Sequence, residues 1–221
     1  LHVVNSYVGF QLLRFDFGAR DRRLFVSLFG IGRDERGFEA GFWCEARELL
    51  GSPTFLTDNH TLPSSRAKSF GLDPERVRAI GYPVEVINPR RAVTTQQGHR
   101  KRVLWASRLD AEKLPNLVFD IARLLPEIEI HMFGRGVLND CALGAPPENV
   151  RVRGPFDGWA SLPIEPFDCF LFTSRWEGLP NIILEAMAAG LPIVASGVGA
   201  IPEVLTEDRG WLVNDVFEAS A

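Results

Sequence analysis

The thirty residues FDCFLFTSRWEGLPNIILEAMAAGLPIVAS, numbers 167–196, hold the pattern that decides the fold. An apolar run at residues 167–173 predicts a buried strand, and residues 192–196 predict a second one. Between them, residues 181–189 follow a helical pattern, and Pro180 is typical of the first turn of a helix. A strand, a helix and another strand in this order predict a βαβ unit with parallel strands.

The same alternation continues on both sides of this unit. In the second half of the chain we expect a helix at residues 114–125 and strands at 103–107, 128–133, 150–152 and 210–213. In the first half we expect strands at residues 1–4, 24–29, 53–57 and 84–87, with helices at 38–50 and 62–70. The sequence therefore predicts an α/β protein with a mainly parallel sheet in its second half.

A polar stretch rich in helix breakers separates the two halves and has no hydrophobic periodicity. We place a linker at residues 91–101, a partial N-terminal domain at 1–90 and a C-terminal domain at 102–221. The chain begins on a strand-like run without a methionine, so we expect a fragment truncated at both ends.

Composition narrows the class of protein. Hydrophobic residues make up 46% and charged residues 24% of the 221 residues, which is typical of a soluble globular protein. The net charge of −4 argues against nucleic acid as a partner. The three cysteines have no zinc-site or disulfide spacing and fit a reducing cytosol. We predict a cytoplasmic location; Arg20, Arg22 and Arg23 leave open a peripheral contact with the inner face of the membrane.

Cations follow the first predicted strand of the second half. Arg108 and Lys113 stand five residues apart where that strand ends, and ligands of open α/β sheets bind at such ends. A guanidinium fork and a mobile ammonium together suit a diphosphate and the charge that develops on it as it leaves. The alternative for each residue alone is an ordinary surface cation.

Carboxylates follow the strand at residues 167–173. Glu177 lies in the loop after this strand, and Glu185 lies eight residues further on, within the predicted helix. Asn181 and Glu185 are four apart and share one helical face. Carboxylates suit hydroxyl groups of a ribose or hexose, while Gly178 lets a ligand approach the backbone near a helix start. The alternative for Glu185 alone is a solvated helix carboxylate.

Two motifs together resemble a known family. The stretch WEGLPNIILEA, with Glu177 and Glu185, resembles the E-x7-E signature of group 1 (family 4) glycosyltransferases. The stretch SRLDAEK, with Arg108 and Lys113, is similar to the arginine–lysine diphosphate motif of the same family. The resemblance covers residues 102–213 and is thin over 1–90. It implies the GT-B fold of two Rossmann-like domains, the first one incomplete here, and a retaining enzyme that uses a nucleotide-diphosphate sugar.

The resemblance also implies roles for individual residues. Arg108 and Lys113 would hold the donor diphosphate, Glu177 would contact the transferred hexose, and Glu185 would bind the ribose. The remaining residues of the implied donor pocket are Phe156 against the base, Gly178, Leu179 and Pro180 around the phosphates and sugar, and Asn181 beside them. No metal or other cofactor is expected, and the acceptor would be a glycan or a lipid-linked glycan. The implied pathway is polysaccharide biosynthesis.

Departures from the family leave two other classes open. The glycine-rich loop of the first domain and the closing C-terminal helix are missing, so a non-catalytic nucleotide-sugar-binding fragment or subunit is the alternative to an enzyme. A nicotinamide-dependent oxidoreductase would need a G-x-G-x-x-G motif after a strand. Residues 196–203 offer only two of the three glycines.

Overall fold

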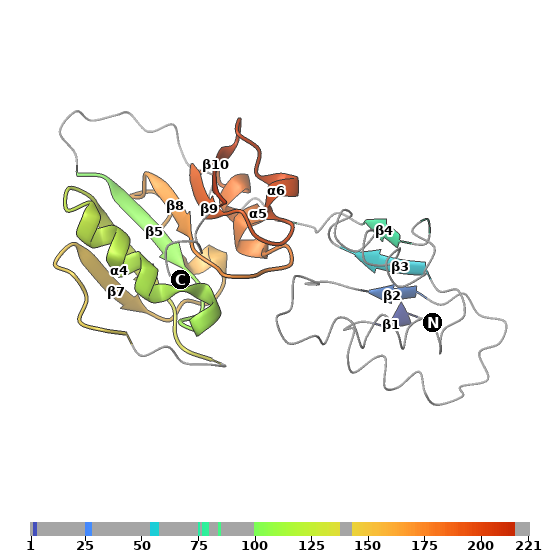
Figure 1. Cartoon of the computed structure of the whole chain (residues 1–221), viewed down its shortest axis with the longest axis horizontal. Coiled ribbons are helices and arrows are strands. Elements are labelled where there is room, and N and C mark those ends of the chain that lie inside the picture. The colour runs from blue at the N-terminus through green and yellow to red at the C-terminus, as the bar shows by residue number, and fades with distance from the viewer. Residues whose placement is uncertain are drawn as a thin grey trace. The chain divides into compact units, whose positions relative to one another are not determined.

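The computed structural model describes residues 100–137 and 143–214, together with residues 2–3, 25–27, 54–57, 75, 77–79 and 84 (Figure 1). The chain divides into two compact units, Leu1–Pro83 with Trp176–Pro180 and Val84–Arg175 with Asn181–Ala221. The predicted helices at 38–50 and 62–70 and most of the predicted linker lie outside the described residues. The domain boundaries at residues 90 and 102 stay predictions.

The first unit contains a parallel sheet whose strands follow one another in chain order, β1-β2-β3-β4. The strands are β1 (His2–Val3), β2 (Phe25–Ser27), β3 (Thr54–Thr57) and β4 (Val77–Ala79). The first three lie within the stretches predicted to be strands.

The fourth strand lies elsewhere than predicted. The sequence pattern predicted a strand at residues 84–87. Val84 lies in no strand, and the rest of that segment is outside the described residues. The strand that closes the sheet is β4, in which Val77 is paired with Phe55 and Ala79 with Thr57. A strand is defined by its pairing to a neighbour, and a local apolar pattern does not determine that pairing.

The second unit contains a six-stranded sheet in which every adjacent pair is parallel. Its strands are β5 (Arg102–Ala106), β6 (Glu129–Phe133), β7 (Val150–Gly154), β8 (Cys169–Phe172), β9 (Ile193–Ser196) and β10 (Gly210–Val213). Their order is β10-β9-β8-β5-β6-β7. The chain runs outward from β5 to β7, returns to the centre at β8 and then runs outward to β10. This is the Rossmann strand order, and its switch point lies between β5 and β8.

One face of this sheet is covered by α4 (Pro115–Leu124), which lies along the β5–β7 side in Figure 1. Its residues Val118, Phe119 and Ala122 pack on side chains from four strands. These are Trp105, Ile130, Met132, Val150 and Leu171. The predicted helix at 114–125 is therefore confirmed, and Pro126 follows its end.

The other face is covered by α5 (Asn181–Ala188), by α6 (Ile201–Val204) and by the connection from β7 to β8, which includes the 3-10 helix η3 (Trp159–Ser161). Its core is made of Leu104, Ala106, Phe170, Phe172, Ile183, Ala186, Ile193, Ala195 and residues from the connection. Helix α5 ends at a left-handed Gly190, whose N–H bonds to Met187 while Leu191 bonds back to Ala186. This is the Schellman arrangement expected of a C-terminal glycine.

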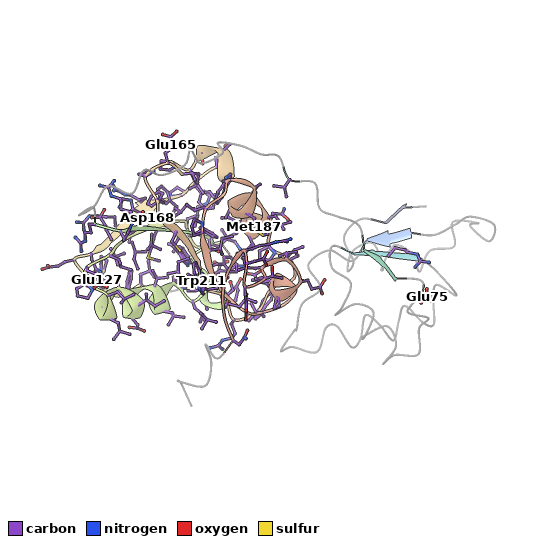
Figure 2. All side chains as sticks on the ribbon, turned by 90° about the horizontal axis from the view of Figure 1, so that it is seen from above. Glu75, Glu127, Glu165, Asp168, Met187 and Trp211 are labelled. Atoms are coloured by element: carbon purple, nitrogen blue, oxygen red, sulfur yellow. The ribbon has the colours of Figure 1, made fainter. Side chains whose placement is uncertain are left out.

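The six strands and the helices α4 and α5 match their predictions to within two residues at each end. The α/β class and the parallel sheet of the second half are therefore confirmed. Side chains fill the space between the sheet and its helices in Figure 2, while Glu127 and Glu165 lie at the outside.

Candidate functional site

The candidate site lies at the carboxyl ends of the two central strands. Strand β5 ends at Ala106 and leads to Arg108, and β8 ends at Phe172 and leads to Ser174. These two ends flank the switch point, where the connections leave in opposite directions and a crevice opens in folds of this kind. Both predicted motifs therefore start at the same edge of the same sheet.

Hydrogen bonds from backbone N–H groups connect the segments after β5, β8 and β9. The N–H of Arg175 donates to the carbonyl of Glu112 over 2.8 Å. The N–H of Ser174 donates to Oγ of Ser196, at the end of β9, over 3.0 Å. The stretches at 108–113 and 174–175 and the start of the glycine loop at 196–203 are thus neighbours in space, although they are far apart in sequence.

Arg108 is held by two carboxylates of its own segment. Its Nη2 donates to Oε1 of Glu112 over 2.7 Å, and its Nη1 donates to Oδ2 of Asp110. Asp110 is fully buried, Glu112 is 9% exposed, and the Arg108 side chain keeps 34% of its surface in solvent. The guanidinium is therefore held by two buried carboxylates, while a third of the Arg108 side chain remains in solvent.

Gly134 lets the ends of β5 and β6 approach each other closely. The N–H of Ser107 donates to the carbonyl of Phe133 over 3.1 Å, and Leu109 donates to Arg135 over 3.0 Å. A Cβ atom on Gly134 would lie 1.9 Å from the carbonyl oxygen of Ser107. Any side chain there would push apart the backbone that carries Arg108.

Lys113 is largely buried in the 3-10 helix η2 (Ala111–Lys113). Its Nζ lies 5.9 Å from the centroid of the Phe172 ring, within the range of a cation–π contact. Its carbonyl accepts a 2.8 Å hydrogen bond from Thr173, whose Oγ1 in turn accepts one of 2.9 Å from the indole N–H of Trp105. This buried chain links the segments after β5 and β8 a second time.

The loop after β8 carries the other predicted residues. Glu177 and Gly178 are buried, Leu179 and Pro180 are half-buried, and Asn181 is exposed at the first position of α5.

Glu185 lies in the middle of α5 and is half-buried. Burial raises the pKa of its carboxyl group above the ordinary value. Residues 100–137 and 143–214 provide no hydrogen-bond donor to this carboxylate. A desolvated acceptor of this kind favours a ligand that brings its own hydroxyl donors.

Phe156 follows β7 and is half-buried against the core that covers the α5 face of the sheet. No group of three or more His, Cys, Asp and Glu side chains suited to a metal ion occurs among the described residues. Within the same part of the chain no helix has the length and apolar character needed to cross a bilayer.

Sequence reasoning missed Asp110 and Glu112 as parts of this site. Both belong to the quoted SRLDAEK stretch, two and four residues after Arg108. An arginine with a carboxylate four residues away is a known pairing within helices, but here the segment forms a short 3-10 helix after a strand. Only the fold shows that Asp110 is completely buried.

Comparison with known proteins places this site in a family. The chain is 32% identical over 121 residues to the sulfoquinovosyl transferase SQD2 of Arabidopsis thaliana, covering 51% of this chain and 23% of that protein. It is 29% identical over 122 residues to the O-antigen biosynthesis glycosyltransferase WbnH of Escherichia coli, covering 52% and 33% of the two chains. The matched region thus spans a third or less of these relatives.

Among solved structures, the fold is similar to that of Anabaena Alr3699/HepE in complex with UDP and glucose, with a TM-score of 0.74 and 17% identity. That match covers 96% of this chain and 64% of the other. The structural neighbours are GT-B glycosyltransferases, which agrees with the expected fold. A model of the family described as glycosyl transferases group 1 matches residues 100–221, the half of the chain that contains the Rossmann-order sheet and Arg108. The chain belongs to the group 1 glycosyl transferases.

Proposed function

We propose that the chain is the donor-binding half of a retaining glycosyltransferase, which moves a hexose from a nucleotide-diphosphate sugar to a glycan or lipid-linked acceptor. One observation carries the proposal: a guanidinium, that of Arg108, is fixed at the switch point of a sheet with Rossmann order. A fixed guanidinium at this place suits an anionic ligand that binds along the carboxyl edge of the strands.

In this proposal Arg108 and Lys113 bind the diphosphate. Arg108 keeps a third of its side-chain surface in solvent, and the largely buried Lys113 adds a second positive charge. Both charges stabilise the negative charge that develops on the diphosphate as its bond to the sugar breaks. Because the guanidinium is already fixed, little reorganisation is needed when that charge appears.

The carboxylates of the site recognise hydroxyl groups. Glu185 binds the ribose, and its raised pKa together with the lack of a donor among the described residues supports this role. Glu177 contacts hydroxyls of the hexose, while the backbone around Gly178, Leu179, Pro180 and Asn181 lines the phosphate and sugar pocket. Phe156 packs on the base from its half-buried position after β7.

The wider setting belongs to the same proposal. The family members named above include an O-antigen biosynthesis enzyme and a sulfoquinovosyl transferase, which supports a glycan or lipid-linked acceptor and polysaccharide biosynthesis. A structural neighbour bound to UDP and glucose supports a nucleotide-sugar donor. We further propose transfer without a metal ion, and action in the cytoplasm or at the inner face of the membrane.

A second candidate is a nucleotide-sugar-binding fragment or subunit without transfer activity. It is favoured by the extent of the family match, which covers residues 100–221 and therefore the donor-binding half alone. The two candidates share the same donor site and differ in whether the bound sugar is transferred or hydrolysed.

Calorimetric titration with UDP, GDP and ADP and with their glucose conjugates tests the donor site. We expect one nucleoside diphosphate to bind, and Arg108→Ala and Glu185→Ala each to weaken it by about tenfold or more. Matched controls are Arg123→Ala and Glu165→Ala, two exposed residues of the same types away from the carboxyl edge. Release of free sugar from the matching donor would separate the enzyme from the binding fragment. Equal weakening by the controls, or no binding by folded protein, would refute the donor site.

A further inference from the structure

Two carboxylates and one guanidinium form a compact group after β5. Arg108 donates to Glu112 over 2.7 Å and also donates to Asp110, so that both outer nitrogens of its fork are engaged. The two carboxylates are almost entirely buried, whereas Arg108 retains a third of its surface in solvent. The negatively charged members of the group are therefore buried, and its positively charged member is partly exposed.

Each carboxylate residue is itself fastened to a different loop of the site. Oδ1 of Asp110 accepts the N–H of Val137, in the loop after β6, over 2.8 Å. The carbonyl of Glu112 accepts the N–H of Arg175, in the loop after β8, over 2.8 Å. Asp110 and Glu112 thus connect the Arg108 guanidinium to the loops after β6 and β8.

Charge alone gives no reason for this arrangement in an anion site. Two ionised carboxylates beside one guanidinium leave the group with a net negative charge, which opposes a diphosphate. A free arginine at the same place would attract the anion more strongly but would lose side-chain entropy on binding. The buried carboxylates weaken the attraction and in return fix the orientation of the fork before the ligand arrives.

We infer that Asp110 and Glu112 are positioning residues, which hold the Arg108 guanidinium in the orientation that meets the diphosphate of the donor. This inference rests on the proposed function, since it assumes that Arg108 binds that diphosphate. The two carboxylates touch Arg108 and do not touch the ligand. Their favourable effect on binding therefore passes through Arg108, whereas their negative charge by itself opposes the ligand.

The sign of one substitution separates positioning from simple electrostatics. Glu112→Gln keeps the size of the side chain and removes one negative charge. If Glu112 positions Arg108, the affinity for the nucleoside diphosphate that binds best among UDP, GDP and ADP falls by about tenfold. The reason is that the ion pair with Arg108 is replaced by a weaker hydrogen bond to a neutral amide oxygen. If the carboxylate only repels the ligand, the affinity rises. An unchanged or higher affinity in the folded variant would overturn the inference.

A double-mutant cycle tests whether the effect passes through Arg108. In an Arg108→Ala background, Glu112→Gln is expected to change the affinity by less than about twofold. Ligand-observed NMR extends the measurement to weak binding. A tenfold loss that persists without Arg108 would overturn the inference while leaving the donor site intact. Failure of the unchanged protein to bind any of the three diphosphates would instead overturn the proposed function, and the inference with it.

Two further variants guard against loss of folding. Asp110→Asn keeps an oxygen for the N–H of Val137 and removes the charge beside Arg108, so it is expected to weaken the same diphosphate in the same direction. Asp120→Asn is the matched control, because Asp120 pairs with Arg123 over 2.7 Å in an exposed position on α4. The Asp120→Asn variant is expected to bind the diphosphate with the same affinity as the unchanged protein. Thermal unfolding of each variant shows which samples are folded.

Discussion

The centre and the edge of the six-stranded sheet reverse the usual distribution of polar and apolar side chains. At the carboxyl ends of the central strands, Asp110 and Ser174 are fully buried and Thr173 is 4% exposed. On the edge strand β10, Trp211 is 65% exposed and Val213 is 45% exposed. Burying polar groups costs free energy unless they are hydrogen-bonded, so the buried polar groups at the centre depend on the hydrogen bonds that hold them.

The topologies of the two sheets explain why polar groups gather at the centre of the second one. In the first unit the described strands follow in order from β1 to β4, so the chain never reverses its direction along that sheet. In the second unit it reverses between β5 and β8. Only a reversal separates the connections on the two sides and leaves room above the strand ends.

The largest effect on stability is expected from adding a single methyl group at Gly134, where the backbones after β5 and β6 lie in close contact. In Gly134→Ala the new Cβ would meet the Ser107 carbonyl oxygen at 1.9 Å, and backbone cannot yield as a side chain does. We expect the free energy of unfolding to fall by about 3 kcal/mol, measured by chemical denaturation, with loss of diphosphate binding. Gly144→Ala is the control, since a Cβ at Gly144 meets nothing within 4 Å. Equal stability of the two variants would contradict the close approach of β5 and β6.

The buried polar chain at the centre predicts the next effect. Thr173→Val removes the hydroxyl that accepts from the indole N–H of Trp105 and donates to the carbonyl of Lys113, so two buried hydrogen bonds are broken. We expect a loss of about 2 kcal/mol in the free energy of unfolding. Thr206→Val, at an exposed hydroxyl that bonds to Asp208, is expected to cost less than about 0.5 kcal/mol. Equal losses for the two variants would show that the buried hydrogen bonds of Thr173 stabilise the protein no more than an exposed hydroxyl does.

Glu185 predicts a dependence on pH that tells a binding residue from a structural one. Its raised pKa means that the folded state holds the proton more tightly than the unfolded state does. This contribution to stability is complete below the unfolded pKa and is lost as the pH rises through the folded pKa. Glu185→Gln is therefore expected to raise the free energy of unfolding at neutral pH by at most about 1 kcal/mol, because partial exposure screens the charge.

Glu185→Gln is also expected to weaken binding of the nucleotide-sugar donor, so stability and affinity change in opposite directions. Unfolding free energies of the unchanged protein and of Glu185→Gln, measured from pH 4 to pH 8, give the comparison. Glu165→Gln, an exposed carboxyl group in Figure 2, is the control that should follow the unchanged protein. A Glu185→Gln variant that is less stable at neutral pH would show that the carboxylate has a structural partner.

Much of the second unit could be predicted because local signals and tertiary packing agree there. Pro180 and Gly190 mark the ends of α5, and the apolar runs of β8 and β9 are buried in a parallel sheet. The candidate site could be located because the polar residues follow strand ends. The strand at Val77–Ala79 was missed because three residues with an arginine in the middle carry no strand signal without their partner.

The orientation of the side chains at the candidate site could not be predicted from the sequence. Arg108 pairs with two carboxylates of its own segment, but those residues are held by Val137 and Arg175, which are distant in sequence. The ring over which Lys113 is buried, that of Phe172, is equally distant. The left-handed backbone of Leu114 is a similar case, because leucine has no preference for that conformation and tertiary structure imposes it.

Leu114 predicts a small gain in stability at the centre. Its φ of 51° at the start of α4 is unfavourable for leucine, and its side chain lies in neither of the two cores described above. Leu114→Gly is expected to raise the free energy of unfolding by about 0.5 kcal/mol, since relief of the backbone exceeds the added entropy of the unfolded chain. Leu117→Gly, inside the helix, is expected to lower it by about 1 kcal/mol or more. A loss at both positions would show that the Leu114 side chain contributes to packing.

The smallest effect is expected at the edge. Trp211 points away from the core that contains Leu212, on a strand with β9 as its neighbour in the described sheet, so little of its surface is removed from water on folding. Trp211→Thr keeps a residue suited to a strand and is expected to change the free energy of unfolding by less than about 0.5 kcal/mol. Diphosphate binding should also be unchanged, because β10 lies three strands from β5. A loss above about 1 kcal/mol would show that Trp211 is removed from water on folding to a greater extent than its exposed fraction indicates. The edge would then be as well packed as the centre, and the contrast between them would reduce to the buried polar groups around Arg108.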